Sequence, residues 1–532
     1  MIARTPDRRR LMAAAGGMML LSGLGRYGPV IAAPSFGDDP FTLGVASGDP
    51  WPDGFVIWTR LAVRPLEEHG GMNMVAVPVI WEVSEDEVFS LVVATGEVLA
   101  RPELSHAVHV EIAGLRPQRP YWYRFHIKGK GANLITSPIG LVRTAPAAGT
   151  LPSQVRLAVA GCQNYPHGWY NAYRHLSRED DLAAVFHYGD YIYEQGPSNI
   201  AITDALGRKV DRQHKGGEIY SLDDYRRRYA QYKSDPDLKA AHAAAAFIMS
   251  FDDHEIDNDW VSAYDQDGTP PELFLLRRYA AMQAWYENMP VRRAQFPRPE
   301  GLRMYRRLDY GQLFRMHVLD TRSYRSNQLC AGDRDPTCPT EDTAERTVLG
   351  TVQEEWLSQG LSQDSCWHLV AQQVRAMPLE RKARDGSIMP IPVDQWSGYP
   401  QAYERLMKTI SDRGLTNVIV ASGDAHMHNV GTLPARFDDR GGEAVATEFL
   451  CTSISSGGDG AAVTTTIQAY LDGDNPNLAL ANHQRGYQTF SIRRDVWETD
   501  IKVIDKVQAP NGRVSTLARF SVLPDKAGLH RG

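Results

Sequence analysis

One strand–helix–strand stretch constrains the fold of this chain more than any other. An apolar run ends at Gly161-Cys162-Gln163, a helical pattern follows, and a second apolar run ends at Gly189-Asp190-Tyr191-Ile192-Tyr193. Two apolar runs joined by a helix predict parallel strands with a crossover connection. Ligands bind beyond the carboxyl ends of strands in such sheets. Cys162, Asp190 and Tyr193 should therefore meet at one edge, where a thiolate, a carboxylate and a phenolate could hold a metal.

The size and charge of the chain limit its class. With 532 residues, it is long for a single core, and two domains plus insertions are expected. A hydrophobic fraction of 43% and a charged fraction of 23% are typical of a soluble globular protein. The net charge of −7 gives no electrostatic case for a nucleic-acid-binding protein.

The N-terminus predicts export. Arg8-Arg9-Arg10-Leu11-Met12 precedes a short apolar run, and small residues follow at Val30-Ile31-Ala32-Ala33. This pattern predicts a signal peptide over residues 1–33, and the twin arginines favour the Tat export machinery as a partner. A membrane anchor is the alternative, but the apolar run is shorter than the ~20 residues needed to span a bilayer. A periplasmic or secreted protein without a stable membrane anchor is therefore expected.

The five cysteines fall into three groups. Cys330 and Cys338 flank a polar loop, and an oxidising compartment favours a local disulfide between them. Cys366 and Cys451 stand beside apolar residues and are predicted to be buried thiols. Cys162 remains, at the end of a predicted strand.

The region from residue 40 to 144 is predicted to be an all-β sandwich of the fibronectin III or immunoglobulin type. Apolar runs and turns recur there at sandwich spacing. Residues 114–125, Gly-Leu-Arg-Pro-Gln-Arg-Pro-Tyr-Trp-Tyr-Arg-Phe, resemble a tyrosine corner, in which a tyrosine hydroxyl bonds back to the chain. His106 and His109 in this region are interpreted as strand residues, with a metal role as the alternative.

A small-residue linker at residues 144–152 is the predicted boundary. From about residue 155 to 520, strands and helices alternate, which predicts a mostly parallel sheet in a layered α/β/α domain. A polar insertion turns helical after a cap at Ser221, and we interpret it as a solvated helical insertion near the site rather than a nucleic-acid surface. Residues 243–250 are predicted to be a strand.

Four predicted strands end in side chains that could hold a metal. These side chains are Cys162; Asp190 with Tyr193; Asp252 and Asp253 with His254; and Asp424 with His426. Oxygen-rich loops with some imidazole suit Ca²⁺, Mg²⁺ or Mn²⁺, whereas a thiolate and a phenolate together favour Fe³⁺. Two or more metal ions would clamp a phosphate and activate water.

Other polar residues could complete such a site. His254 or His428 could protonate a leaving alkoxide. Arg322 and Arg375 follow predicted strands and could hold phosphate oxygens, with structural ion pairing as the alternative for each.

Several short motifs together resemble a known family. They are Phe41-Thr42-Leu43-Gly44-Val45-Ala46-Ser47-Gly48-Asp49-Pro50, Gly161-Cys162-Gln163, Gly189-Asp190-Tyr191-Ile192-Tyr193, Asp252-Asp253-His254-Glu255, Leu319-Asp320-Thr321-Arg322, Gly423-Asp424-Ala425-His426 and Arg485-Gly486-Tyr487. Over residues 40 to 520, the chain resembles the PhoD family of secreted alkaline phosphatases and phosphodiesterases, within the calcineurin-like metallophosphoesterases. Each motif is weak alone, but their combination is specific.

The resemblance implies a layered metallophosphoesterase domain that releases phosphate from small-molecule phosphomonoesters, phosphodiesters or both. It also implies Fe³⁺ with Ca²⁺, bridged by Asp190. The implied ligands are Cys162, Asp190, Tyr193, Asp253 (or Asp252), Asp424 and His426. The family also uses an asparagine, for which Asn258 is the nearest match.

Two other functions remain open from the sequence. A phospholipase D-like phosphodiesterase uses the same kind of site. A non-catalytic surface-binding or carbohydrate-binding protein would combine the β domain with a degenerate α/β domain. The intact set of predicted ligands argues against the second alternative.

Overall fold

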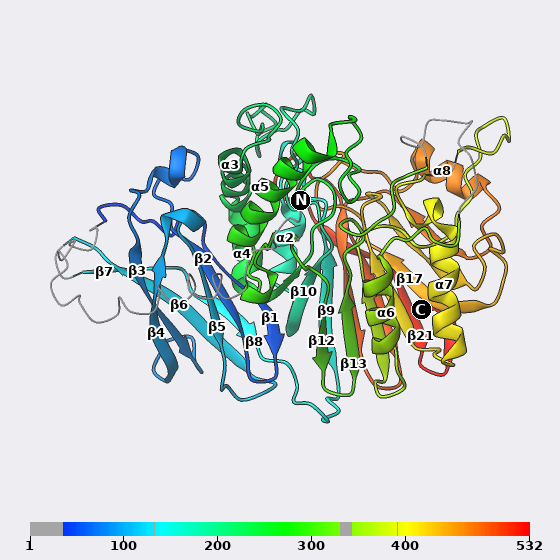
Figure 1. Cartoon of the computed structure of the whole chain (residues 1–532), viewed down its shortest axis with the longest axis horizontal. Helices are drawn as coiled ribbons and strands as arrows, with labels where there is room; N and C mark the ends of the chain where they lie inside the picture. The colour runs from blue at the N-terminus through cyan, green and yellow to red at the C-terminus, as the bar shows by residue number, and fades with distance from the viewer. Residues whose placement is uncertain (1–35, 131–132, 300, 330–342, 391, 532) are drawn as a thin grey trace, which may run out of the picture.

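The computed structural model describes residues 36–130, 133–299, 301–329, 343–390 and 392–531 (Figure 1). The predicted signal peptide over residues 1–33 and the predicted disulfide between Cys330 and Cys338 lie outside the described residues. No helix within the described ranges is both long and apolar enough to cross a membrane.

Two large sheets form the centre of the molecule. The first has ten strands, in the order β22 (Lys526–Arg531), β21 (Val514–Leu523), β20 (Trp497–Ile504), β19 (Gly486–Ile492), β9 (Val155–Ala160), β10 (Leu182–His187), β11 (Phe247–Met249), β1 (Val45–Trp51), β2 (Gly54–Arg60) and β5 (Ala107–Ile112). The second has seven, in the order β12 (Arg306–Tyr310), β13 (Phe314–Val318), β14 (Trp367–Ala371), β15 (Val418–Ser422), β17 (Ala444–Leu450), β16 (His428–Pro434) and β18 (Leu478–Asn482).

Each large sheet is parallel only at its centre. Strands β9, β10 and β11 pair in parallel, as do β13, β14, β15 and β17. The outer strands β19, β20, β21 and β22 pair antiparallel in that order, and β16 pairs antiparallel with both β17 and β18. The predicted strand–helix–strand unit is confirmed, because α2 (Asn171–Leu176) connects β9 to β10. The expectation of a mostly parallel sheet was wrong, because local periodicity does not determine which neighbour a hairpin strand joins.

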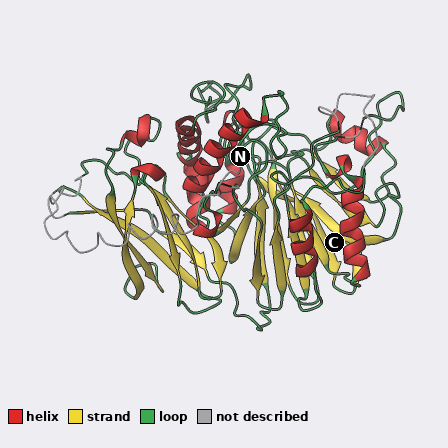
Figure 2. Cartoon of the chain, in the orientation of Figure 1, coloured by secondary structure: helices red, strands yellow, loops and turns green. Residues whose placement is uncertain are grey.

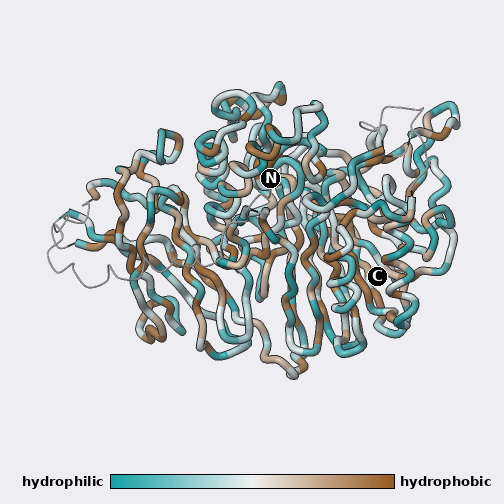
Figure 3. Tube along the Cα trace, in the orientation of Figure 1, coloured by the Kyte–Doolittle hydropathy of each residue, from teal (hydrophilic) through white to brown (hydrophobic). Residues whose placement is uncertain are grey.

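Alternate side chains of the strands build separate cores. Figure 3 shows hydrophobic residues along the central strands. In β9, Leu157 and Val159 enter the core shared with the second sheet, whereas Ala158 and Ala160 face the helices. The period of two along a strand produces this division. Between the sheets, the ring of Trp497 lies 5.8 Å from that of Trp367. The result is a four-layered domain with helices outside two facing sheets (Figure 2).

The helices cover the outer faces of the sheets. Those over the first sheet are α2, α3 (Leu222–Lys233), α4 (Pro236–Ala244) and α5 (Pro271–Asn288), and those over the second are α6 (Thr351–Gly360), α7 (Pro400–Asp412) and α8 (Thr465–Asp472). Ser221 caps α3 through a capping box with Asp224, as its position predicts.

The strand predicted at residues 243–250 is shorter than expected. Helix α4 extends to Ala244, and β11 begins only at Phe247. The Asp235 side chain caps this helix, Pro236 occupies its first turn, and alanines continue it. Good helix formers after a strong cap outweigh the apolar character of the segment.

A third sheet completes the N-terminal β domain. It contains β4 (Val92–Ala100), β3 (Val77–Ser84), β6 (Pro120–Lys128), β7 (Leu134–Thr136) and β8 (Gly140–Arg143). It shares a core with β1, β2 and β5, so the predicted sandwich is confirmed. The tyrosine corner is also present, because the hydroxyl of Tyr121 accepts a hydrogen bond from the Arg116 amide at 3.0 Å.

The sandwich is continuous with the domain that follows. Gly48 of β1 pairs in parallel with Phe247 of β11, so one sheet runs from the sandwich into the α/β domain. The boundary predicted at residues 144–152 stays a prediction.

Of the predicted buried thiols, Cys451 is buried, whereas Cys366 is half-exposed because it precedes the first residue of β14.

The ring of Tyr188 lies between the ends of the two large sheets. A side-chain carbon added to Gly161, after β9, would lie 2.4 Å from this ring. One added to Gly423, after β15, would lie 2.1 Å from it. The Tyr188 hydroxyl also donates a hydrogen bond to the Thr452 carbonyl at 2.9 Å. Both positions therefore exclude a side chain, and the close contact fixes how the two sheets meet.

We expect Gly423→Ala to lower the free energy of unfolding by about 1–3 kcal/mol, the usual cost of overpacking a core. Thermal and denaturant unfolding measure this loss. Gly217→Ala is the control, because nothing lies within 4 Å of the carbon that it adds. If both variants are as stable as the wild type, Tyr188 does not fix the junction.

Candidate metal centre

The predicted ligands meet where the central parallel strands end. Cys162 follows β9, Asp190 follows β10, Asp252 follows β11 and Asp424 follows β15. Long loops gather at this edge of the sheets (Figures 1 and 2). Because both sheets contribute strands here, side chains that are far apart in the sequence become neighbours.

The backbone at these strand ends is strained. The φ angles are 50° at Cys162, 56° at Asp190, 66° at Asp424 and 55° at His426. Left-handed conformations at residues other than glycine cost roughly 1–3 kcal/mol each and cluster at functional sites. The Cys162 and Gln163 amides donate hydrogen bonds of 3.0 Å to the carbonyls of Gly189 and Asp190, which holds the first two turns together.

A thiol, a phenol, a carboxylate and an imidazole form one side of the centre. Oδ2 of Asp190 lies 3.3 Å from Cys162 Sγ and 2.8 Å from the Tyr193 hydroxyl. The same hydroxyl lies 3.1 Å from Nε2 of His426. The ligand atoms of Cys162, Asp190 and His426 all lie within 4.8 Å of one another. We call these four residues the thiol–phenol group.

Carboxylates form the other side. Asp252, Asp253 and Asp424 make one close group, and Asp253, Asp259 and Asp394 make another. Asp190 and Asp253 also form a group with His254, so they connect the two sides. We call Asp252, Asp253, Asp259, Asp394 and Asp424 the carboxylate group.

The chemistry of these side chains fits a cation. Asp190 Oδ1, Asp252 Oδ2 and Asp253 Oδ1 are buried without a hydrogen-bond partner among the described residues. Burial and the nearby carboxylates raise the pKa of both Asp190 and Asp424 well above the usual range. Burial and Asp190 do the same to the pKa of the Cys162 thiol. Buried negative charge of this density needs positive charge beside it, and metal ions supply that charge.

Arg322 is part of the scaffold of the centre. Its guanidinium is fully buried and lies 2.6 Å from Asp252, 3.6 Å from Asp253 and 2.8 Å from Asp394. Burial raises the pKa of Asp252 to about 6 even though Arg322 opposes the rise. Arg322 therefore forms structural ion pairs, and its phosphate-binding role stays a prediction.

Two predicted residues lie away from these groups. The Arg375 guanidinium packs 4.9 Å from the Tyr470 ring and lies 3.5 Å from the Asn429 side chain. His428, at the start of β16, accepts hydrogen bonds from the Thr452 amide and the Gln488 side chain. Burial lowers the pKa of His428 to about 3, so its imidazole is neutral. His428 belongs to none of the metal groups, and the acid and phosphate-binding roles expected for the two residues stay predictions.

His254 is the histidine that the structure brings to the centre. Its Nδ1 lies 2.7 Å from Glu194 Oε2, and its ring stacks on Tyr193 at 4.0 Å. Burial lowers the pKa of His254, but the charges of Glu194, Asp253 and Asp190 outweigh it and raise the pKa well above the usual value. The imidazolium therefore holds its proton beside the metal groups.

Asn258 is close to the centre but turned away from it. Its side-chain amide donates a hydrogen bond to Gln266 at 2.9 Å, and its backbone amide contacts Glu194. The neighbouring Asp259 enters the carboxylate group instead. His106 binds the Val75 carbonyl within the β domain, and His109 binds the carbonyls of Tyr286 and Met289 at the end of α5, as expected for structural histidines.

Sequence patterns missed several residues that support the centre. Asp394 and Ser456 stand in loops without a ligand motif, and Glu194 directly follows the Gly189–Tyr193 motif. Ser456 Oγ lies 2.7 Å from both the Cys162 carbonyl and the Tyr193 hydroxyl. Arg485, part of the Arg-Gly-Tyr motif, donates a 2.6 Å hydrogen bond to the His426 carbonyl. The Arg485-Gly486-Tyr487 motif and the position of Glu194 beside Tyr193 are the sequence features that point to these supporting residues.

Comparisons with known proteins show the family of the chain. The profile of the PhoD-like phosphatase family matches residues 157–501, and that of the PhoD-like phosphatase N-terminal domain matches residues 28–146. The chain is 40% identical to alkaline phosphatase D of Bacillus subtilis (strain 168), over 99% of this chain and 89% of that protein.

Solved structures give the same result. A structure of PhoD with 40% identity matches with a TM-score of 0.86, over 94% of this chain and 93% of that one. The purple acid phosphatase PPD1 from yellow lupin (Lupinus luteus) seeds shares the fold alone, with 13% identity and a TM-score of 0.52 over 90% of this chain and 73% of that one. The suspected resemblance is confirmed: this chain belongs to the PhoD-like phosphatase family and is a phosphoesterase.

Proposed function

We propose that the enzyme is exported and depends on Fe³⁺ and Ca²⁺ held at the strand-end centre. The observation that carries the proposal is the meeting of Cys162 Sγ and the Tyr193 hydroxyl at one oxygen of Asp190. Thiolate, phenolate and imidazole donors favour Fe³⁺ at the thiol–phenol group. The other oxygen of Asp190 has no hydrogen-bond partner in the described part of the chain and is free to bridge to a second ion.

The carboxylate group suits Ca²⁺. Calcium takes six to eight oxygen ligands in flexible geometry. Asp253 offers a carboxylate oxygen close to one of Asp424 and to one of Asp259, whereas Asp252 and Asp394 are both paired with Arg322. Asn258 is a weaker candidate, because its side chain is bonded to Gln266.

Residues around the metal groups have distinct roles in ester hydrolysis. When bound, the metal ions supply Lewis-acid stabilisation of phosphate oxygens and a water of lowered pKa. His254 carries a proton that a leaving alkoxide needs, and Glu194 fixes the orientation of its ring through Nδ1. Arg322 keeps Asp252 and Asp253 in position.

The preference between phosphomonoesters and phosphodiesters is not decided by these residues. A phospholipase D-like phosphodiesterase remains the alternative within the same chemistry. The ratio of kcat/KM for p-nitrophenyl phosphate to that for bis-p-nitrophenyl phosphate distinguishes the two preferences.

Export by the twin-arginine route follows from residues 1–33. We expect replacement of Arg9 and Arg10 by lysine to keep folded, active enzyme inside the cell, because the export machinery reads this pair. Cell fractionation with an activity assay measures the outcome. Replacing Arg4 by lysine is the control, and equal export of both variants contradicts the proposal.

We expect Cys162→Ala to lose iron and to lower kcat at least about 100-fold while the fold is kept. Loss of a residue that only orients a metal ligand typically lowers activity about 10–100-fold, and loss of a direct ligand should lower it more. Asp190→Asn should lower the content of both metals. Metal analysis, circular dichroism and p-nitrophenyl phosphate hydrolysis measure these effects. Cys366→Ala is the control thiol. Full iron content and full activity in Cys162→Ala would show that the ligand assignment is wrong.

We expect His254→Asn to lower kcat by about 10²–10⁴-fold without loss of metal, the usual contribution of a general acid. Glu194→Gln should have a smaller effect, because an amide oxygen still accepts a hydrogen bond from Nδ1. The loss should shrink for esters with strongly acidic leaving groups, which need no protonation.

The matched control for this pair is His69→Asn in the β domain. Steady-state kinetics across a series of phenyl phosphates gives the dependence of kcat on the pKa of the leaving group. An equal loss in kcat for every leaving group would assign His254 a structural role instead.

A further inference from the structure

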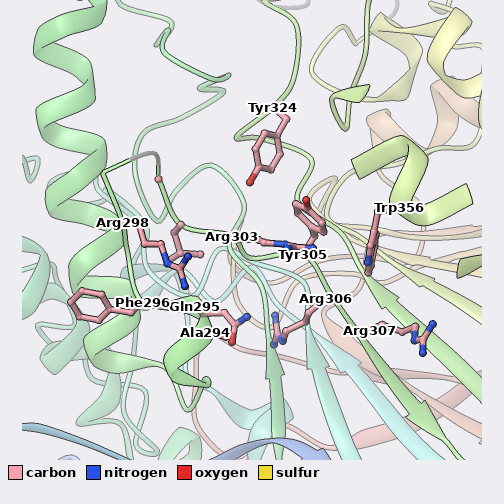
Figure 4. Close-up of a pocket in the computed structure, with 12 residues that line it drawn as sticks. Ala294, Gln295, Phe296, Arg298, Arg303, Tyr305, Arg306, Arg307, Tyr324 and Trp356 are labelled. Carbon is pink, nitrogen blue, oxygen red and sulfur yellow. The ribbon is translucent and has the colours of Figure 1, made fainter. Parts of the chain in front are cut away.

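A pocket separate from the metal centre lies at the edge of the second sheet where its parallel strands end. It has a volume of about 510 Å³ and is lined by residues from the segment 294–307, together with Tyr324 and Trp356 (Figure 4). Arg306 begins β12 and pairs with Val318, the last residue of β13. The pocket therefore opens at the carboxyl end of β13, and its volume is in the usual range for small-molecule sites.

Aromatic rings form one wall of the pocket. The Tyr305 ring lies 5.8 Å from that of Tyr324 and 5.1 Å from that of Trp356, and both contacts are edge-on. Tyr324 is 39% exposed, and Trp356 is half-buried. In each edge-on contact the edge of one ring lies against the face of the other, so the exposed part of Tyr324 is the ring surface that can stack on a nucleobase.

Arginines give the pocket its charge. Arg306 is paired with Asp49, and Arg307 is paired with Asp309. Arg298 and Arg303 are exposed, and neither forms an ion pair with any carboxylate in the described part of the chain. The Arg303 guanidinium lies over the Tyr305 ring at 4.5 Å. Unpaired guanidinium groups bind phosphate oxygens in bidentate geometry, so the pocket favours an anion.

A buried acceptor distinguishes this pocket from a solvated basic surface. Gln295 is only 5% exposed, and its Oε1 has no hydrogen-bond partner among the described residues. Figure 4 shows Gln295 between the side chains of Phe296 and Arg306. A buried acceptor without a partner costs free energy unless a donor arrives. The exocyclic amino group of a base is such a donor.

We propose that this pocket binds a nucleoside phosphate. The arginines hold the phosphate, the faces of Tyr324 and Trp356 stack on the base, and Gln295 accepts a hydrogen bond from an amino group of the base. This binding goes beyond the hydrolysis of phosphate esters at the metal centre and does not depend on the identity of the metals.

Calorimetric titration of the metal-loaded enzyme with the 5′-methylenephosphonate analogue of adenosine 5′-monophosphate tests the proposal, because a CH₂ group replaces the ester oxygen and the analogue cannot be hydrolysed. We expect it to bind at least tenfold tighter than adenosine, ribose 5-phosphate or inorganic phosphate. Arg303→Ala and Tyr324→Ala should each weaken its binding about tenfold, with Trp356→Ala as a second test of stacking. Hydrolysis of p-nitrophenyl phosphate should stay unchanged in these variants.

Arg436→Ala is the matched control, because Arg436 is an exposed arginine paired with Asp438 outside the pocket. Two results would overturn the proposal. In one, ribose 5-phosphate or adenosine binds as tightly as the analogue. In the other, the pocket variants bind the analogue as the wild type does. The hydrolysis assay reports on the metal centre separately, so failure of one account is distinguishable from failure of the other.

Discussion

Buried negative charge at the junction of two sheets is the constraint on which the site depends. Six aspartates from strand ends and loops converge there: Asp190, Asp252, Asp253, Asp259, Asp394 and Asp424. Arg322 is the guanidinium that contacts three of them. Arg322 and the His254 imidazolium bring two positive charges to this number of buried carboxylates, and further cations would balance the rest. The strained backbone at Cys162, Asp190 and Asp424 is a second cost that the surrounding structure bears.

The fold supplies the convergence by packing two sheets at one edge. Tyr188 fills the space between Gly161 and Gly423, so the loops after β9 and β15 approach each other closely. The sandwich strand β1 extends the first sheet beyond β11, which ties the N-terminal domain to the strand that carries Asp252. The N-terminal domain thus supports the sheet that positions the centre.

The convergence of the strand-end residues could be predicted because each follows an apolar run. Cys162, Asp190, Asp253 and Asp424 needed only strand positions and the rule that ligands gather at carboxyl ends. Arg375 and His428 follow the same pattern, but their side chains bond to Asn429 and Gln488, away from the metal groups. Strand position alone does not determine which way a side chain at the edge turns.

Other parts of the structure gave no local signal. Asp394 contacts Arg322 from a loop whose path depends on tertiary packing and whose sequence resembles no ligand motif, whereas Glu194 directly follows the Gly189–Tyr193 motif. The antiparallel edges of both sheets depend on long-range pairing, such as that between β19 and β9. Residues 243–246, before β11, resemble a strand in the sequence because an alanine-rich segment is apolar whether it forms a helix or a strand.

The central claim is that metal ions balance the charge of this centre, with iron on the side of Cys162 and Tyr193. Anomalous diffraction from crystals of the metal-loaded protein, recorded on both sides of the iron absorption edge, tests it most directly. The account predicts an iron peak within bonding distance of Cys162 Sγ, the Tyr193 hydroxyl oxygen and an oxygen of Asp190, with a second ion among the carboxylates. Ordered Cys162 and Asp190 side chains in fully active crystals without metal density between them would contradict the account.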